Sequence, residues 1–167
     1  MSSNTIEILQ PNPYDLVDYN ILVAGNAAAF EGSLSIYVSD GHYEFRTIAN
    51  VGSMALKQFQ AKIEIPTHIN FKLDRLLITA ADDSAIEPGN PEMAQVQVPV
   101  LFGPRILPNY YGYWKYEVKR GDTLSKIARE LYGNSSMWKV IYRANIDKIK
   151  NPNIIYPKQI LKIPRAI

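Results

Sequence analysis

Residues 116–128, Tyr-Glu-Val-Lys-Arg-Gly-Asp-Thr-Leu-Ser-Lys-Ile-Ala, decide the fold of the C-terminal part of the chain. Tyr116 to Lys119 alternates in polarity and predicts a short strand, and the glycine-containing segment after it predicts a turn. A helix should follow, because Asp122 or Thr123 can cap its first turn and Gly133 suits its C-terminal cap. Its apolar residues have the i, i+3, i+4, i+7 spacing of one buried face and are Leu124, Ile127, Ala128 and Leu131.

A second helix and a closing strand are predicted further along the chain. Asn134-Ser135-Ser136 supplies a helix cap, and the helix should fade near Asn145. One face of this helix carries Trp138, Ile141, Tyr142 and Asn145. Prolines and asparagines in residues 151–157 predict a loop, and residues 159–163 predict a strand. The predicted order is therefore β, α, α, β over residues 115–167.

This layout is similar to the LysM domain nearly from end to end. The resemblance is carried by residues 116–128, Trp138-Lys139-Val140-Ile141-Tyr142-Arg143-Ala144-Asn145, Asn151-Pro152-Asn153-Ile154-Ile155-Tyr156-Pro157 and Gln159-Ile160-Leu161-Lys162-Ile163-Pro164. Lys158 departs from the pattern, because many LysM domains have glycine before the glutamine. A side chain at this position can alter the conformation of the tight turn, since glycine adopts left-handed backbone more readily than other residues.

The resemblance implies a shallow groove in which a polymer of N-acetylated sugar lies between two loops. Carried over to this sequence, one loop provides Gly121, Asp122, Thr123, Leu124 and Ser125, and the other provides Asn151, Pro152, Asn153, Ile154, Ile155 and Tyr156. An N-acetyl group offers an amide to backbone groups and a methyl to an apolar residue such as Ile154, and a sugar face can lie on the Tyr156 ring.

Each of these residues also has a purely structural interpretation. Asp122 and Thr123 cap a helix whether or not a sugar binds, and Leu124 is the first core residue of that helix. Trp138 shares an apolar face with Ile141, which favours a position in the core over a sugar platform. The sequence leaves both interpretations of the loops open.

The N-terminal half alternates short apolar runs with turn signals. Residues 34–38 and 59–65 each place apolar side chains on one face of a strand, and the Asp40-Gly41 pair predicts a hairpin. About seven short strands within roughly a hundred residues predict an all-β sandwich. The predicted strands are Thr5–Leu9, Tyr19–Gly25, Ser33–Ser39, Tyr43–Ala49, Gln58–Ile65, Arg75–Ala80 and Ala94–Leu101.

Residues 6–101 resemble the immunoglobulin-like domain described from bacterial spore-germination proteins. The residues that carry this likeness are Ile8-Leu9-Gln10-Pro11, Leu22-Val23-Ala24-Gly25-Asn26-Ala27 and Phe30-Glu31-Gly32-Ser33-Leu34 before the Asp40-Gly41 turn. The likeness implies an immunoglobulin-like fold. It implies no particular function, because the sandwich fold hosts many unrelated ones.

Residues 102–114 separate the two predicted domains. They contain two prolines and two glycines among aromatic residues, without a regular period, and this predicts a linker that packs partly against one or both domains. The chain is therefore interpreted as an α+β protein of two domains, an N-terminal immunoglobulin-like sandwich at 1–101 and a βααβ LysM module at 115–167.

Charge differs between the two halves. Residues 1–101 carry net −7 and residues 102–167 carry net +9, which together give the +2 of the whole chain. This division either gives the domains different partners or only keeps both in solution. The chain has no cysteine, no start typical of a secretory signal and no long apolar stretch. We expect no membrane insertion and a place in the cytoplasm or in a particle assembled there, or at the cell wall if a signal peptide has been removed.

The sequence contains no constellation typical of catalysis. A nucleophile with a base, paired carboxylates in a site and a set of metal ligands are all missing, so we expect no enzyme, no cofactor and no metal. The two histidines, His42 and His68, fall in separate β segments. The basic residues of the C-terminal half are scattered and match no nucleic-acid-binding motif, so we expect no nucleic-acid partner.

Two functions are compatible with these features. The favoured one is a non-enzymatic structural adaptor that docks onto other protein subunits. The module resembles LysM modules without export signals, which occur in baseplates of phage-tail-like contractile injection systems and in a cytoplasmic potassium-sensing protein of enteric bacteria. The alternative is a protein that binds peptidoglycan, or a chitin-like glycan, and anchors its sandwich to the cell wall.

Overall fold

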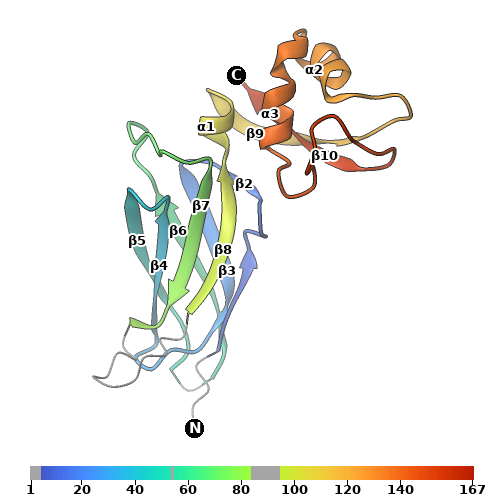
Figure 1. Cartoon of the computed structure of the whole chain (residues 1–167). Coiled ribbons are helices and arrows are strands. Elements are labelled where there is room, and N and C mark those ends of the chain that lie inside the picture. The colour runs from blue at the N-terminus through green and yellow to red at the C-terminus, as the bar shows by residue number, and fades with distance from the viewer. Residues whose placement is uncertain (1–4, 54, 84–94) are drawn as a thin grey trace.

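The computed structural model describes residues 5–53, 55–83 and 95–167. Ala94, with which the last predicted strand of the sandwich begins, lies outside these residues. Strands make up most of the regular secondary structure, and a smaller module that contains two helices sits at one end of an elongated β-sandwich (Figure 1). In the described part of the chain, no helix has both the length and the apolar character needed to span a bilayer.

Two sheets face each other in the sandwich. One has the order β1-β3-β6 and consists of β1 (Ile6–Gln10), β3 (Asn20–Ala27) and β6 (Lys57–Glu64). The other has the order β2-β8-β7-β4-β5 and consists of β2 (Leu16–Val17), β4 (Ser33–Ser39), β5 (Glu44–Asn50), β7 (Arg75–Ala81) and β8 (Gln95–Phe102). A strand is present in each of the seven predicted segments. The two-residue β2 was not predicted, because its parallel pairing with β8 leaves no local pattern.

Alternation along these strands builds the core of the sandwich. β3 buries Ile21 and Val23, and β6 buries Phe59, Ala61 and Ile63, while the side chains that alternate with them are exposed. Phe71 is also buried, and its ring makes edge-on contacts with Tyr43, Phe45 and Phe102 at centroid separations of 6.2, 6.1 and 5.0 Å. Each large apolar side chain of this kind stabilises the fold by about 1.5–3 kcal/mol on burial.

The C-terminal module has the predicted order β, α, α, β. Its elements are β9 (Tyr110–Glu117), α2 (Leu124–Tyr132), a 3-10 turn (Ser135–Met137), α3 (Trp138–Arg143) and β10 (Ile160–Ala166). The Thr123 hydroxyl caps α2 by accepting a hydrogen bond from the Lys126 amide at 3.2 Å. Gly133 ends α2 with left-handed backbone at φ 71°, so both predicted ends of this helix are confirmed.

The segment predicted to be a linker, residues 102–114, has more regular structure than expected. Helix α1 (Gly103–Ile106) occupies its first part, and β9 begins inside it at Tyr110. Both prolines of the segment precede β9 and therefore do not interrupt the strand. β9 exists because it pairs with the distant β10, where Trp114 lies opposite Ile163. Pairing over such a distance in sequence does not appear in local periodicity.

Asn145 fixes helix α3 against the outer edge of β10. Its side chain is fully buried and donates hydrogen bonds to the carbonyl oxygens of Ile141 at 2.8 Å and Lys162 at 2.7 Å. Its Oδ1 atom accepts a hydrogen bond from the Lys162 amide at 2.8 Å. A buried polar group without a partner costs about 1–3 kcal/mol, so this amide specifies one register between helix and strand.

Two more side chains satisfy backbone groups on the same edge of β10. Lys148 Nζ donates to the Ile160 carbonyl at 3.0 Å, and the Tyr132 hydroxyl donates to the Pro164 carbonyl at 2.8 Å. Burial raises the pKa of Tyr132, which keeps the hydroxyl protonated as a donor. The outer edge of β10 is therefore closed by side chains of its own module.

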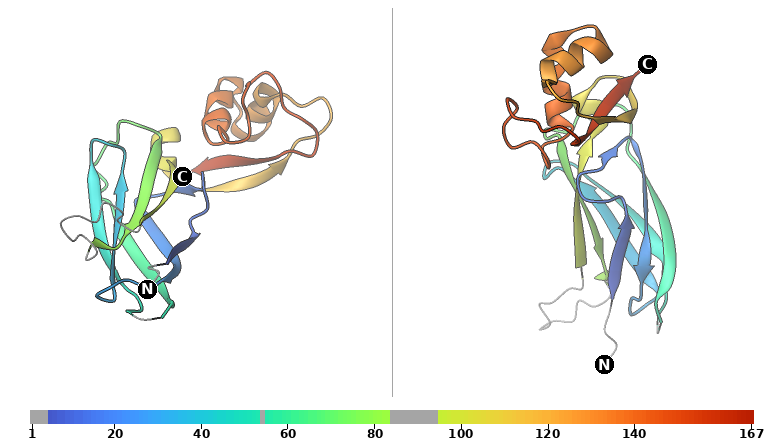
Figure 2. Two further views of the ribbon diagram at one scale, coloured as in Figure 1. Left: turned by 60° about the horizontal axis from the view of Figure 1, so that its bottom comes forward. Right: turned by 90° about the vertical axis from the view of Figure 1, so that its right-hand side faces the viewer.

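An apolar cluster joins the module to the sandwich. The module lies at the end of the sandwich where α1 and the start of β9 are found (Figures 1 and 2). Its buried members come from the sandwich, from α1 and the turn after it, and from the start of β9 and the end of α3; they are Leu16, Leu101, Ile106, Leu107, Tyr110, Val140 and Ala144. Gly103 is required here, because a Cβ atom at this position would lie 2.4 Å from the Tyr110 ring. The aromatic segment thus packs against both parts of the molecule, as predicted.

A bidentate ion pair crosses the same junction. Arg143 at the end of α3 donates from Nε to Asp74 Oδ2 at 2.7 Å and from Nη2 to Asp74 Oδ1 at 2.6 Å. Nη2 also donates to the Arg105 carbonyl at 3.0 Å. The hydrogen bonds to Asp74 raise the pKa of Arg143. Two parallel N–H···O contacts define direction as well as distance, so this pair orients the module on the sandwich.

Lys158 adopts left-handed backbone, with φ 71°, at the position where the sequence departs from glycine. Its amide donates to the Val118 carbonyl at 2.7 Å, which holds the turn beside the end of β9. The turn therefore forms in spite of the side chain. A residue other than glycine in this conformation is strained by roughly 1–2 kcal/mol.

Replacing Arg143 by alanine should loosen the junction while leaving both parts folded. The side chains of Arg143 and Asp74 are 36% and 27% exposed, so solvent screens the pair and we expect a loss of only about 1 kcal/mol in unfolding free energy. The matched control is Arg105→Ala, because Arg105 has a single contact with Asp74, at 3.2 Å. Calorimetry and small-angle scattering should show a larger effect for Arg143→Ala, and equal effects would contradict the orienting role.

Replacing Lys158 by glycine should stabilise the protein. Release of left-handed strain outweighs the greater chain entropy that glycine gives the unfolded state, so we expect a gain of about 0.5–1 kcal/mol. The control is Lys150→Gly, at an exposed position without left-handed backbone, which should not raise the melting temperature. A neutral or destabilising Lys158→Gly in thermal unfolding would refute this account of the turn.

Candidate functional site

The first predicted loop follows β9 and is held by hydrogen bonds to Asp122. Its Oδ2 atom accepts from the Lys119 amide at 2.8 Å and from the Tyr116 hydroxyl at 2.9 Å. Burial, together with the hydrogen bond to Asp122, raises the pKa of Tyr116 to about 12. Gly121 has φ 87°, and its carbonyl accepts from Lys126 Nζ at 2.8 Å. Asp122 and Gly121 therefore shape the loop.

The second predicted loop precedes β10 and is closed by its own asparagine. Asn151 Oδ1 accepts from the Asn153 amide at 3.0 Å, and the Asn151 carbonyl accepts from the Ile154 amide at 3.0 Å. Further along, the Tyr156 amide donates to Gln159 Oε1 at 3.1 Å. These bonds fix the path of the backbone and leave the Asn153 side chain projecting from it.

A groove of about 340 Å³ lies between the two loops. Residues from both loops and from the start of α3 line it, namely Thr123, Leu124, Ser125, Trp138, Pro152, Asn153 and Ile155. Six of these are among the eleven residues predicted for the site. The structure thus brings together the two segments that the sequence separates by some 25 residues.

The other five predicted residues do not line the groove. Gly121, Asp122 and Asn151 act on backbone geometry, as described above. Ile154 and Tyr156 are 49% and 66% exposed and project from the second loop. Their side chains are accessible to a ligand that extends beyond the groove, but they do not form its walls.

Trp138 lines the groove, whereas the sequence favoured a position in the core. The structure gives it both roles. Its partly buried ring packs against the core of the module, 6.3 Å from the Tyr142 ring centroid, and also borders the space between the loops. The sequence position of Trp138 is consistent with its place at the groove, because Trp138 is the first residue of α3 and so lies at the end of the helix and not in its middle.

The groove combines apolar walls with free polar side chains. Leu124, Pro152 and Ile155 offer surface to a methyl group, and Trp138 offers an aromatic face to a sugar ring. Within the described residues, the Ser125 hydroxyl and the side-chain amide of Asn153 have no hydrogen-bond partner. An amide can donate and accept at once, as the N-acetyl group of a sugar requires.

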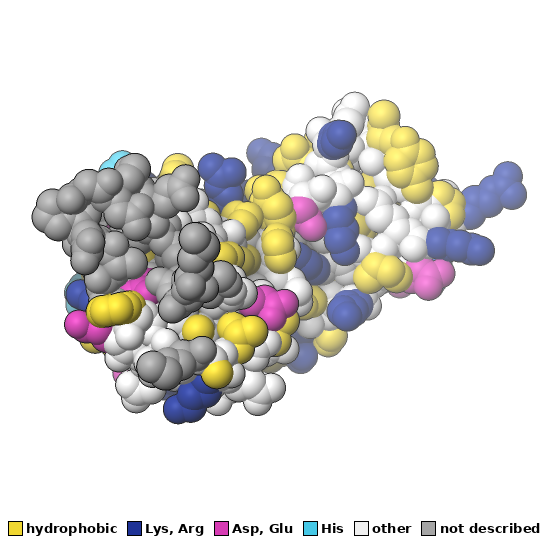
Figure 3. All heavy atoms as spheres, turned by 90° about the horizontal axis from the view of Figure 1, so that it is seen from below, with side chains coloured by type: hydrophobic (Ala, Val, Ile, Leu, Met, Phe, Trp, Pro, Cys, Tyr) yellow, Lys and Arg dark blue, Asp and Glu magenta, His cyan; other side chains and the backbone are white. Residues whose placement is uncertain are grey.

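Basic side chains flank the two loops of this site. Lys and Arg side chains are spread over the module, where acidic side chains are few, in the view from the sandwich end (Figure 3). Arg120 and Lys150 directly precede the two loops and are exposed. Among the described residues, no group of three or more His, Cys, Asp or Glu side chains could hold a metal ion.

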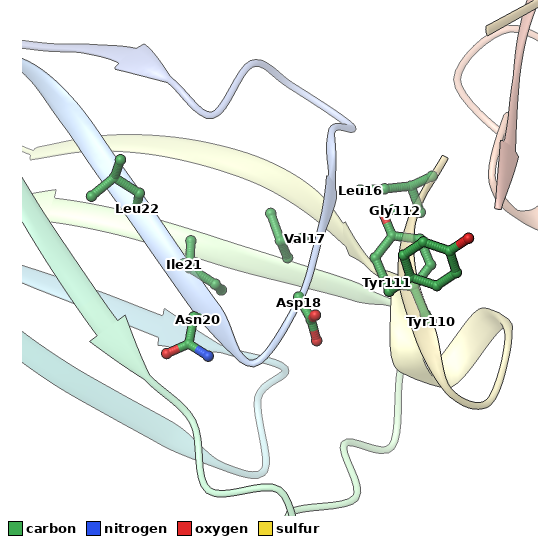
Figure 4. Close-up of a pocket in the computed structure, with 9 residues that line it drawn as sticks. All are labelled: Leu16, Val17, Asp18, Asn20, Ile21, Leu22, Tyr110, Tyr111 and Gly112. Carbon is green, nitrogen blue, oxygen red and sulfur yellow. The ribbon is translucent and has the colours of Figure 1, made fainter. Parts of the chain in front are cut away.

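Two other hollows contain none of the predicted site residues. One, of about 280 Å³, lies where β2 and the start of β3 meet the start of β9, with Asp18 and Asn20 on one side and Tyr111 on the other (Figure 4). The second, of about 640 Å³, lies on the outer face of the five-stranded sheet. There the Tyr37 hydroxyl is already bonded to Asp83 at 2.7 Å.

Comparison with known proteins finds two family models that match separate parts of the chain. Residues 116–164 match the family model of the LysM domain, and residues 5–84 match the immunoglobulin-like domain of bacterial spore germination. No solved structure matches the chain.

The chain is also similar to curated proteins over part of its length. The potassium binding protein Kbp of Escherichia coli is 49% identical over 49 residues, which are 29% of this chain and 33% of Kbp. Treponemal membrane protein B of Treponema pallidum is 40% identical over 65 residues, which are 36% of this chain and 20% of that protein. The chain thus spans a third or less of these relatives. It carries a LysM domain at residues 116–164, preceded at residues 5–84 by an immunoglobulin-like domain of the spore-germination type.

Proposed function

We propose that this protein is a non-enzymatic glycan-binding protein whose LysM groove holds a polymer of N-acetylated hexosamine such as peptidoglycan. The observation that carries the proposal is the groove between the two loops, which the Trp138 ring lines together with the Ser125 hydroxyl and the Asn153 amide, both unpaired among the described residues. The match to the LysM domain supports a binding role for this module.

The groove is pre-formed, which favours binding without a large entropic cost. Thr123, Asp122 and Asn151 hold the two loops by hydrogen bonds within the chain, so a ligand need not order them. The shallow shape exposes part of any bound sugar to solvent. We therefore expect modest affinity for a short oligomer and tighter retention on an insoluble polymer that presents many sites.

Loss of the two free polar side chains should weaken binding without affecting the fold. The double variant Ser125→Ala/Asn153→Ala should bind a chitin oligomer or insoluble peptidoglycan about tenfold less tightly, since each lost hydrogen bond contributes about 0.5–1.5 kcal/mol. Neither side chain has a partner in the described structure, so the melting temperature should not change. Calorimetry and pull-down measure the binding.

The control is Ser136→Ala/Asn50→Ala, which removes the same two side-chain types from exposed positions outside the groove. It should bind like the unchanged protein. Binding must also persist at high salt, because the positive module can attract anionic wall polymers without recognising a sugar. Binding that disappears in salt and is equal in the two double variants would overturn the groove assignment.

A second candidate function is that of a structural adaptor, including one in the baseplate of a contractile injection system. The observation that favours it is the junction, where a buried apolar cluster and the bidentate Arg143–Asp74 pair fix the geometry of the two domains. An adaptor needs such a fixed geometry to hold two partners at a set distance. The matches described above include no resemblance to baseplate proteins, so this candidate rests on the junction.

The adaptor hypothesis makes a different prediction from the glycan hypothesis. In cells, an adaptor should migrate with a large particle in a density gradient, and Asp74→Ala/Arg143→Ala should reduce its share in that particle while the groove variant does not. The groove variant should instead lose attachment to the wall if glycan is the partner. A protein found only as a small free species, with both variants alike, would eliminate the adaptor.

A further inference from the structure

One edge of the β9–β10 ribbon is open. The Val118 amide donates to the Gln159 carbonyl, and Tyr116 and Trp114 lie opposite Leu161 and Ile163. In an antiparallel pair, the backbone N–H and C=O groups of one residue point toward the partner strand and those of the next residue point away from it. Because Val118 is bonded toward β10, the backbone groups of Tyr113, Lys115 and Glu117 point away from β10. Within the described residues, these outward groups have no hydrogen-bond partner.

The two edges of the ribbon differ in how they are protected. On β10, the side chains of Asn145, Lys148 and Tyr132 bond the outward groups, and Pro164 has no amide hydrogen to offer. Among the described residues, no side chain bonds the outward backbone groups of β9 in this way. In Figure 2 (left) the helices lie beyond β10, and the far side of β9 is free of other elements over its second half. Open edges of this kind are the sites at which extended chains add to sheets.

The side chains on the open edge select a partner by charge. Lys115 and Glu117 are both exposed and point to the same face of the strand, because they are two residues apart. In an antiparallel pairing of β9 with a second β9 centred on Tyr116, Lys115 of one copy lies opposite Glu117 of the other. The two-fold symmetry repeats this contact, so two opposite-charge pairs form on the same face.

Neighbouring registers are unfavourable for the same reason. The two nearest registers that keep outward backbone groups opposite each other are centred on Lys115 and on Glu117. The first places Lys115 opposite Lys115, and the second places Glu117 opposite Glu117. Each such register sets like charges directly across from one another, which destabilises a sheet pair. Of the three registers centred on Lys115, Tyr116 and Glu117, the one centred on Tyr116 alone satisfies both the hydrogen-bond alternation and the charges.

We propose that β9 is a homodimer interface at which two copies of this chain pair edge to edge and form a continuous sheet in the order β10-β9-β9-β10. The two-fold axis runs perpendicular to the sheet, so the helices of both copies lie on the same face of the sheet, near its two opposite edges. This pairing does not depend on what the groove binds. It places two LysM grooves in one particle, which strengthens attachment to a repeating polymer.

Directed cross-linking tests both the contact and its register. The chain has no cysteine, so Lys115→Cys and Glu117→Cys can be made separately and then mixed under mild oxidation. Residues opposite one another in a hydrogen-bonded antiparallel pair are about 5.5 Å apart at Cα, within the range of a disulfide. The mixture should give a covalent dimer several-fold more abundant than either variant gives alone.

Charge reversal tests the same register by affinity. Lys115→Glu should weaken dimerisation by about tenfold, and Glu117→Lys should do the same, while Lys115→Glu/Glu117→Lys should restore it. The control is Lys139→Glu, which makes the same charge change at an exposed position on α3. Sedimentation velocity up to about 1 mM is appropriate, because small interfaces are weak.

Three outcomes would overturn the proposal. The first is a monomer throughout that concentration range together with no cross-linking above a mixed Lys139→Cys and Lys150→Cys control. The second is a stronger cross-link in either variant alone than in the mixture, which would place the strands in another register. The third is a dimer whose affinity is the same in Lys115→Glu and Lys139→Glu. Glycan pull-down by the monomeric variants reports separately on the groove.

Discussion

The pairing of β9 with β10 is the interaction on which the rest of the C-terminal half depends. It brings Tyr110–Glu117 beside Ile160–Ala166, two segments that lie at opposite ends of the module in sequence. At the end of the ribbon, the Val118 amide and carbonyl bond to Gln159 and Lys158. The loop that follows β9 and the loop that precedes β10 therefore leave the ribbon at the same place, and the groove lies between them. Without this pairing, the two loops that line the groove would not be held in a fixed position relative to each other.

The first residues of β9 also connect the module to the sandwich. Tyr110 belongs to the apolar cluster with Leu101 and Val140, so one strand is part of the module at one end and part of the junction at the other. The ion pair of Arg143 with Asp74 adds direction more than free energy, because both side chains are partly exposed. Burial of the apolar cluster supplies most of the stabilisation at the junction. Lys162 supports this arrangement from β10, where its Nζ donates to the Tyr14 carbonyl of the sandwich and burial lowers its pKa.

Local signals in the sequence were sufficient for most of the elements but not for their long-range contacts. The stripe from Leu124 to Leu131, the Thr123 cap and Gly133 predicted α2 correctly, because each acts within one or two turns of helix. The strands of the sandwich could be predicted for the same reason, through alternation. β9 was missed at its start, since the aromatic residues from Tyr110 to Trp114 acquire strand structure only by pairing with residues after Ile160. The groove was predicted by resemblance, and the position of Trp138 at its wall could not be derived from a helical face alone.

The two candidate functions make different demands on the same rigid junction. For glycan binding, the junction is useful but not essential, because the groove lies in loops held by Asp122, Thr123 and Asn151 within the module. For an adaptor, the junction is essential, since a flexible connection would not set the distance between two partners. Substitutions at Arg143 and Asp74 and substitutions in the groove therefore act on separate properties of the molecule. A chain that only tethered a sandwich to a polymer could have used a flexible linker, and the ordered strand found here is the feature that any account of its function must explain.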